Sequence, residues 1–208
     1  NLYLIDTRLL MAKNGIFNIK RNVFVLGLVS LLNDISNEMI RPLLPIFLTV
    51  TLGAPVAMVG LIEGMAKSIA SFLEIGSGML SDRLRKRKSL IVSGYGLAVA
   101  ARSFLALATT ALQVFMIVVI DRAGKGLRNA PRDAMIAESS KAHRGRAFGF
   151  HRAMDNLGGT IGPALALLLI PFMAMRDMFM VALIPGALGV ILVALFVKES
   201  FKKPKEEI

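Results

Sequence analysis

The chain has 208 residues, of which 55% are apolar and 19% are charged. Soluble domains are less apolar and more highly charged, so this composition argues against a soluble enzyme and against a disordered segment. Basic residues outnumber acidic ones by 25 to 14, and in so apolar a chain this excess indicates cytoplasmic loops of a membrane protein rather than a nucleic-acid-binding surface. The absence of Cys excludes disulfides and thiolate zinc sites, and two His leave little for a His-based metal site.

Six predominantly apolar segments follow one another along the chain, each long enough to cross a bilayer as a helix. We expect these spans at residues 23–50, 56–80, 90–110, 112–137, 147–175 and 178–197. The fourth span gives the weakest hydropathy signal, because its second half carries Arg122, Lys125, Arg128 and Arg132. The chain therefore divides into an N-terminal segment (1–22), a six-helix region (23–197) and a C-terminal segment (198–208).

The loops between the spans alternate in charge. Sixteen of the 25 basic residues lie before the first span, in the loops after the second and fourth spans, or after the sixth span. The opposite loops contain one basic residue, Arg176. The positive-inside rule then predicts that both termini are cytoplasmic, and the alternation holds only if the fourth span crosses the membrane. The sequence thus predicts an all-α integral membrane protein with six transmembrane helices.

Charged and amide side chains gather on one face of spans one, two, four and five. Span three contains one charge, Arg102, and span six contains none. The order polar, polar, apolar therefore occurs twice, and two copies of a three-helix repeat must have inverted orientations in the membrane. Inverted repeats with a site near the bilayer midplane are typical of secondary transporters. We expect spans three and six to face lipid and the other four to surround an aqueous cavity.

Ionisable residues inside a span are costly and usually have a function. The residues expected to line the cavity are Asn33, Asp34, Asn37, Glu38, Arg41, Arg122, Lys125, Arg128, Asn129, Arg152 and Asp155. For the span-four cations, an internal ion-pair network explains the pattern as well as ligand binding does. We expect Arg122 to bind the ligand or to couple transport, and Arg132 to be structural. A proton-relay role is open to His151, on the polar face of span five.

The loop between spans two and three has the sequence Gly78-Met-Leu-Ser-Asp82-Arg83-Leu-Arg-Lys-Arg87-Lys88. It resembles the loop signature of the major facilitator superfamily, which has a Gly, three residues, Asp-Arg and a basic cluster. The family usually has a Gly two residues after this Arg, where the present chain has Arg85. A Gly at position 78 allows close helix approach, and the carboxylate of Asp82 can interact with a helix N-terminus in a partner half. The resemblance implies a gating role for Gly78, Asp82, Arg83, Arg87 and Lys88; the alternative is a topology signal alone.

Two further motifs resemble the same family. Asp121-Arg122-Ala-Gly124-Lys125-Gly126 is similar to its span-four motif, and it is not a nucleotide-binding loop because it lacks the GxxxxGK[ST] spacing and follows no strand. Gly158-Gly159-Thr-Ile-Gly162-Pro163 is similar to its GxxxGP motif, which is often associated with antiporters. Ala166 and Leu167 replace the trailing Gly pair of that motif. We expect the span-five segment to serve helix packing and a Pro bend.

The resemblance covers residues 23–197 and implies one half of a twelve-helix fold, the N-terminal six helices. It implies a secondary active transporter in the cytoplasmic (inner) membrane of a prokaryote, working by alternating access. The cavity cations favour a small anionic or zwitterionic organic solute, and the acids of spans one and five favour proton coupling. Multidrug efflux of amphipathic compounds and a non-transporting membrane scaffold are the alternatives.

The expected partners are the solute, the lipid bilayer and a second six-helix half, with no nucleic acid, metal or cofactor. Residues 198–208 resemble the start of the family's central loop, so we favour a truncated chain over a separately encoded half or a pair of identical halves. An enzyme is not expected, because no arrangement of nucleophile, base and orienting group is found.

Overall fold

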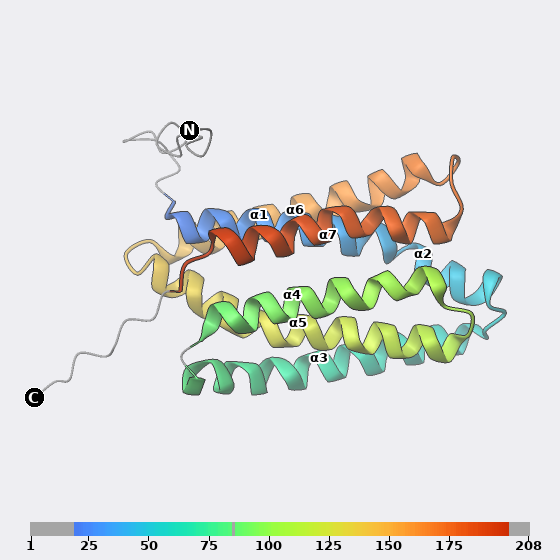
Figure 1. Ribbon diagram of the computed structural model, residues 1–208, viewed down its shortest axis with the longest axis horizontal. Helices are drawn as coiled ribbons and strands as arrows, with labels where there is room; N and C mark the ends of the chain where they lie inside the picture. The colour runs from blue at the N-terminus through green and yellow to red at the C-terminus, as the bar shows by residue number, and fades with distance from the viewer. Residues whose placement is uncertain (1–18, 85, 200–208) are drawn as a thin grey trace, which may run out of the picture.

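The computed structural model describes residues 19–84 and 86–199, which fold into a bundle of helices with no strand among them (Figure 1). The helices are α1 (Arg21–Ile40), α2 (Leu43–Ile46), α3 (Val56–Leu84), α4 (Arg87–Ser103), α5 (Ala111–Ser139), α6 (Arg144–Leu169) and α7 (Met175–Phe196). Most of the expected N- and C-terminal segments, together with Arg85, lie outside the described residues.

Two of the long helices are extended by short irregular turns. The rod Arg21–Thr51 comprises α1, α2 and a π-helical turn (Phe47–Thr51), and it is interrupted near Pro42, which has no amide hydrogen to donate. Gly53 then reverses the chain with a φ of 65°, a conformation that is costly for residues with a Cβ. After α4 comes a 3₁₀ turn, Phe104–Leu107. With these extensions, six long rods correspond to the six expected spans, and the predicted all-α fold is confirmed.

The fourth span is one of the two longest helices despite its charges. Helix α5 begins with a capping box, in which the Thr110 hydroxyl accepts from the Gln113 amide at 3.3 Å and the Gln113 side chain accepts from the Thr110 amide at 3.2 Å. Its 29 residues give a length of about 44 Å, which exceeds a hydrocarbon core of about 30 Å. Four rods are long and apolar enough to cross a membrane. Helices α5 and α6 are not among these four, because they contain charged segments.

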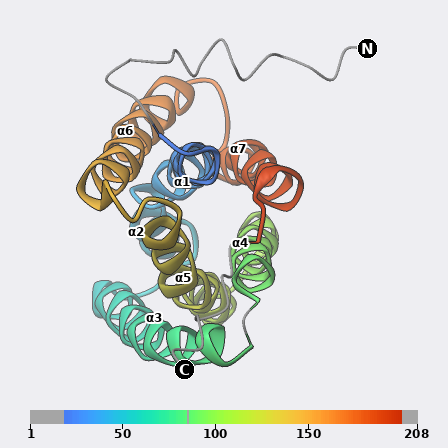
Figure 2. The same cartoon turned by 90° about the vertical axis from the view of Figure 1, so that its left-hand side faces the viewer.

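The helices form two groups of three, α1 with α6 and α7, and α3 with α4 and α5 (Figure 2). Helix α1 packs on α6 and α7, helix α5 packs on α3 and α4, and the groups meet where α4 packs on α7 and α1 on α5. Exchanging α1 with α5, α3 with α6 and α4 with α7 leaves this set of contacts unchanged. The sequence repeats differ from these packing groups: the first comprises the rods of α1, α3 and α4, and the second comprises α5, α6 and α7. Successive rods run in opposite directions (Figure 1), so the two repeats are inverted relative to each other.

The core contains two apolar clusters separated by a polar layer. Members of the cluster at one end include Phe47, Ile62, Val114 and Phe179. Members at the other end include Leu26, Ile91, Met135 and Val193. The buried polar residues between the clusters are Asn33, Ser36, Arg102 and Asp121. Asn33 and Ser36 fall near the middle of the rod Arg21–Thr51, whereas Arg102 lies one residue before the end of α4.

Helix α4, expected to face lipid, has two different sides. Its outer side exposes apolar residues such as Leu97, but its inner side buries Tyr95 and Arg102. Helix α3 is the most exposed of the candidate spans and presents Phe72 and Ile75 to the surroundings. The single charge of span three therefore points into the bundle, because a guanidinium facing lipid would have no partner.

Candidate functional site

The polar layer is organised by one ion pair. Arg102, which is 3% exposed, places its Nε 2.7 Å from Oδ1 of Asp121. The same guanidinium donates to the hydroxyl of Ser36 at 2.9 Å and to the amide oxygen of Asn33 at 3.3 Å. These four residues come from α4, α5 and α1. A buried guanidinium with three acceptors is well satisfied, so this cluster holds the three central helices together.

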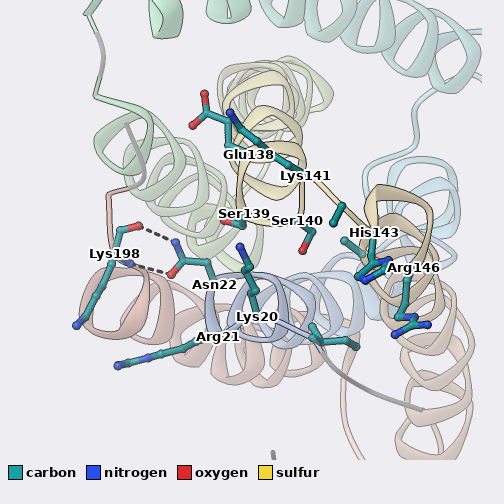
Figure 3. A pocket seen from close by; sticks show the side chains of 13 residues that line it. Lys20, Arg21, Asn22, Glu138, Ser139, Ser140, Lys141, His143, Arg146 and Lys198 are labelled. Carbon is teal, nitrogen blue, oxygen red and sulfur yellow. Dashed lines mark hydrogen bonds between the residues drawn. The ribbon is translucent and has the colours of Figure 1, made fainter. Parts of the chain in front are cut away.

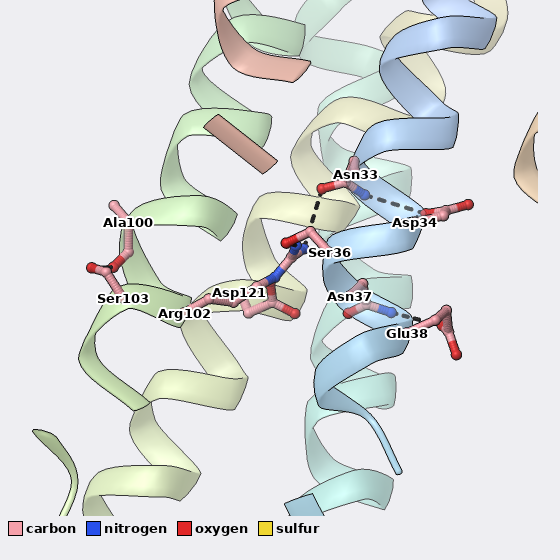
Figure 4. A network of polar contacts seen from close by, with 9 residues as sticks. All are labelled: Asn33, Asp34, Ser36, Asn37, Glu38, Ala100, Arg102, Ser103 and Asp121. Atoms are coloured by element: carbon pink, nitrogen blue, oxygen red, sulfur yellow. Dashed lines mark hydrogen bonds and ion pairs between the residues drawn. The ribbon is translucent and has the colours of Figure 1, made fainter. Parts of the chain in front are cut away.

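The same network reaches the acids of α1 (Figure 4). The amide nitrogen of Asn33 donates to Asp34 at 3.3 Å, so Asn33 connects Arg102 to Asp34. One helical turn further on, Asn37 donates to Glu38 at 2.8 Å, and Glu38 lies 3.5 Å from Arg41. In Figure 4, Asp34 and Glu38 point away from Arg102, on the other side of α1. The two acids therefore share one face of α1, and the Arg102 cluster contacts the opposite face.

The cations of α5 differ in their partners. Arg132 contacts Asp133 through Nε and Nη2 at 3.0 and 2.9 Å. Arg128 is buried, and its guanidinium lies 4.1 Å from the centre of the Tyr95 ring, which is cation–π geometry. Lys125 is exposed on the face of the bundle. Within the described part of the chain, neither Lys125 nor Arg128 forms an ion pair, although both act electrostatically on Asp34.

Arg122 lies beside a small cavity next to the polar layer. Its Nη2 is 4.0 Å from Glu63 of α3, a distance at the limit for an ion pair. The cavity, about 30 Å³ in volume, is also lined by Asn37, Arg102 and Asp121, and a space of this size can hold a water molecule. Arg122 is thus only loosely held, whereas Asp121 is neutralised by Arg102 from another helix.

Helix α6 contributes a second titratable pair. His151 is buried, and its Nδ1 lies 3.3 Å from Oδ2 of Asp155, one turn along the helix. The neighbouring Arg152 is exposed. On the opposite side of the bundle, Asn129 donates to Glu74 of α3 at 3.1 Å. Among the expected cavity residues, Asn129 therefore forms a hydrogen bond to a neighbouring helix, whereas the Arg152 side chain is exposed.

The expected gating residues lie at the end of α3 and the start of α4. Arg87 connects two acids, with Asp82 at 3.1 Å and Glu138 of α5 at 2.7 Å. The Asp82 side chain is 71% exposed, whereas that of Arg87 is 8% exposed. The backbone nitrogen of Lys88 donates to Glu199 at 3.0 Å, and Arg83 is exposed. A Cβ added at Gly78 would contact Ala130 of α5 at 3.4 Å, an ordinary packing distance.

The glycines of α6 face α1 at close range. A Cβ at Gly158 would lie 2.7 Å from the carbonyl oxygen of Leu31, and one at Gly162 would lie 2.9 Å from that of Ile35. Gly159 has no neighbour within 4 Å of such a Cβ. Pro163 lies within α6, which continues to Leu169. The motif thus places a stripe of two glycines, rather than all three, against α1.

The structure therefore brings most of the expected cavity residues to the faces of α1, α5 and α6, and it adds residues that the sequence did not single out. Ser36 and Tyr95 gave no sequence signal, because neither is charged. Arg102 gave one, as the lone charge of an apolar span. Among the described residues, no group of His, Asp and Glu could hold a metal ion.

The comparisons with known proteins agree with this architecture. The sequence model described as Major Facilitator Superfamily matches residues 26–208. The chain belongs to the major facilitator superfamily. An uncharacterised MFS-type transporter of Methanocaldococcus jannaschii is 37% identical over 183 residues, which are 87% of this chain and 46% of the relative. The superfamily consists of transporters rather than enzymes, so the chain is an integral membrane protein of a solute-transporting family.

Two other proteins of this superfamily match at lower identity. Multidrug resistance protein MdtH of Photorhabdus laumondii is 29% identical over 63% of this chain and 33% of its own length. A crystal structure of a POT family transporter in complex with a thioalcohol-conjugated peptide superposes with a TM-score of 0.80 at 19% identity, over 89% of this chain and 40% of that one. This likeness shows a shared fold. The chain spans less than half the length of these relatives.

Proposed function

We propose that the chain is the N-terminal half of a secondary active transporter that moves a small anionic or zwitterionic organic solute by alternating access, coupled to protons. The observation that carries this proposal is that two α5 cations, the exposed Lys125 and the buried Arg128 over the Tyr95 ring, have no ion-pair partner among the described residues, and that both act electrostatically on Asp34 of α1. At mid-depth in a membrane, unpaired cations are costly unless they serve a ligand. A carboxylate of the solute would complete the site.

Asp34 supplies a route for coupling. When Asp34 is ionised, it offsets the positive potential of Lys125 and Arg128 and competes with an anionic solute. When it is protonated, the two cations are free to attract the solute. Proton and solute would then promote each other's binding, and the linkage is reciprocal. The bond from Asn33 holds the carboxyl in place for this role.

The proposal also includes a location and a partner. The cytoplasmic membrane of a prokaryote is the expected site, with both described chain ends inside, where the loop cations of the positive-inside pattern lie. A second six-helix unit, either a C-terminal half or another copy, would close the cavity. Because the chain contains no Cys, Lys86→Cys gives a single labelling site in the exposed loop between α3 and α4. Labelling of this variant by an impermeant maleimide only after cells are opened supports the topology; labelling in intact cells contradicts it.

One relative favours a second candidate, export of amphipathic compounds, because MdtH is named as a multidrug resistance protein. The two candidates differ in the charge of the solute. A cavity built around Lys125 and Arg128 repels a lipophilic cation such as tetraphenylphosphonium, whereas an exporter of cationic drugs binds it. A scaffold without transport activity would bind neither class.

The experiment measures binding to the purified chain in nanodiscs, with succinate and dialanine as probes and tetraphenylphosphonium as the contrast. We expect succinate or dialanine to bind with proton uptake, and Lys125→Gln to weaken this binding by about tenfold, equivalent to about 1.4 kcal/mol. Lys86→Gln, which removes an exposed cation outside the cavity, is the matched control. Asp34→Asn is expected to abolish proton uptake while binding persists. Binding of tetraphenylphosphonium alone would favour export, and no binding of any probe would contradict the proposal.

A further inference from the structure

A large hollow lies at the end of the bundle where the described chain begins and ends (Figure 3). Its volume is about 870 Å³, far larger than the cavity beside Arg122. Three parts of the chain surround it: the start of α1, the connection between α5 and α6, and Lys198, two residues after the end of α7. None of its lining residues belongs to the proposed solute site.

The lining is strongly basic. It includes five Lys or Arg residues and one His, namely Lys20, Arg21, Lys141, Arg146, Lys198 and His143. Among the described residues, Glu138 is the one acid in the lining, and it is 2.7 Å from Arg87 and therefore already neutralised. In Figure 3, Lys20 extends toward the hydroxyl-bearing residues Ser139 and Ser140, while Arg21 points to the side. The described lining thus combines an excess of positive charge with hydroxyl donors.

Backbone groups add to this potential. Helices α1 and α6 both begin at the hollow, with Lys20 and His143 at their N-cap positions and no side-chain cap on either. Neither first turn contains an acidic residue. Free amide hydrogens and the positive end of the helix dipole therefore face the same space as the cations.

One wall of the hollow is fixed by a two-way contact. The side-chain nitrogen of Asn22 donates to the carbonyl oxygen of Lys198 at 2.9 Å, and its side-chain oxygen accepts from the Lys198 amide at 3.2 Å. This contact ties the end of α7 to the start of α1. Cations that only set the membrane topology do not need to be held around one hollow. Here the contact between Asn22 and Lys198 holds part of the lining in place.

We propose that this hollow binds a phosphate group, supplied either by the headgroup of an anionic phospholipid or by a soluble phosphate compound. Phosphate oxygens accept hydrogen bonds from ammonium, guanidinium, hydroxyl and backbone N–H donors, and the lining supplies all four. The hollow lies at the ends of the spanning helices, at the level of the lipid headgroups. Binding there would tie α1, α6 and α7, the three helices of one packing group, at a point far from the solute site.

The test uses the full chain in detergent and a charge-matched pair of double variants. Lys20→Gln with Lys141→Gln removes two lining cations, and Lys86→Gln with Arg144→Gln removes two exposed cations outside the lining. Native mass spectrometry would measure retention of phosphatidylglycerol against phosphatidylcholine, and a thermal-shift titration with inorganic phosphate would measure the soluble form. We expect the lining variant to bind the phosphate probe at least about tenfold more weakly than the control variant.

Each outcome has a defined meaning. A selective loss of phosphatidylglycerol in the lining variant identifies a lipid headgroup as the source, and a selective loss of the inorganic phosphate shift identifies a soluble compound; both support the proposal. Equal behaviour of the two variants toward both probes overturns it, because the cations would then act only through their total charge. Circular dichroism of both variants checks that the lining variant keeps its helices.

Discussion

Arg102 and Asp121 form a buried ion pair, with 2.7 Å between Nε and Oδ1, across the boundary of the two inverted repeats. Arg102 belongs to the last helix of the first repeat and Asp121 to the first helix of the second. Ser36 and Asn33 add the first helix of the first repeat to the same cluster. The two repeats are therefore joined by a buried polar contact, with an apolar cluster toward each end of the bundle.

The first prediction concerns the stability of this pair. Arg102→Met leaves the Asp121 carboxylate buried without its partner, and we expect a loss of about 3–5 kcal/mol in the free energy of unfolding. The double variant Arg102→Met with Asp121→Leu removes both charges and should recover most of that loss. Thermal unfolding in detergent measures both effects. The exposed Arg144→Met serves as the control, and a single variant as stable as this control would contradict a structural role for the pair.

The ion pair also shows how far the sequence predicts the site. Helix number, order and inversion follow from hydropathy and loop charge, because each depends on the chain's own solvation. The partner of Asp121 does not follow. Within its own span, Asp121 is followed by four cations, yet the structure pairs it with Arg102, 19 residues earlier. Choosing among several possible partners requires knowing which helix faces which, and that depends on packing.

The α6 glycines illustrate the same limit. The motif predicts a packing surface in span five, but it does not say which glycine makes contact. A helical rotation of 100° per residue separates Gly158, which faces the Leu31 carbonyl, from Gly159, which faces open space. The register of α6 on α1 decides between them, and side chains on both helices set that register.

The second prediction follows from this register. Gly158→Ala places a Cβ against backbone, which cannot move without separating α1 from α6, and we expect a destabilisation of about 1–3 kcal/mol. The Cβ added by Gly159→Ala has no neighbour within 4 Å. This variant should leave the melting temperature unchanged or slightly raised, because Ala has a higher helix propensity than Gly. The two neighbouring variants control for each other in a thermal unfolding assay. Equal effects would mean that the α1–α6 register differs from the one described.

The third prediction concerns the loop between α3 and α4. Arg87 contacts two acids, Asp82 and Glu138. Asp82→Asn removes the charge of the exposed one, and the 2.7 Å contact between Arg87 and Glu138 remains. We expect a stability change below about 0.5 kcal/mol, as for other exposed ion pairs. Glu138→Gln weakens the shorter and less exposed contact and should cost about 1.5–3 kcal/mol. Chemical unfolding of the two variants provides the comparison, and a larger loss for Asp82→Asn would reverse the assigned roles.

The last prediction separates two arginines of α5. Arg132 makes two contacts of 2.9–3.0 Å to Asp133, whereas Arg122 is 4.0 Å from Glu63 and lines a cavity. Arg132→Gln should therefore lower stability by about 1–3 kcal/mol, because it leaves a partly buried carboxylate without its donor. Arg122→Gln should change stability by less than about 1 kcal/mol, since a contact at the distance limit contributes little.

Binding should show the opposite order. If Arg122 contacts the solute, Arg122→Gln weakens succinate or dialanine binding by about tenfold, and the paired change Glu63→Gln does not restore it. Arg132→Gln should bind normally once its stability is restored by Asp133→Asn, because the direct ion-pair partner of Arg132 is its neighbour Asp133 in α5. Thermal unfolding and calorimetric titration of the two single arginine variants and the two paired variants separate the two roles. An Arg122→Gln protein with unchanged stability and unchanged binding would remove Arg122 from the site and leave Lys125 and Arg128 as its cations.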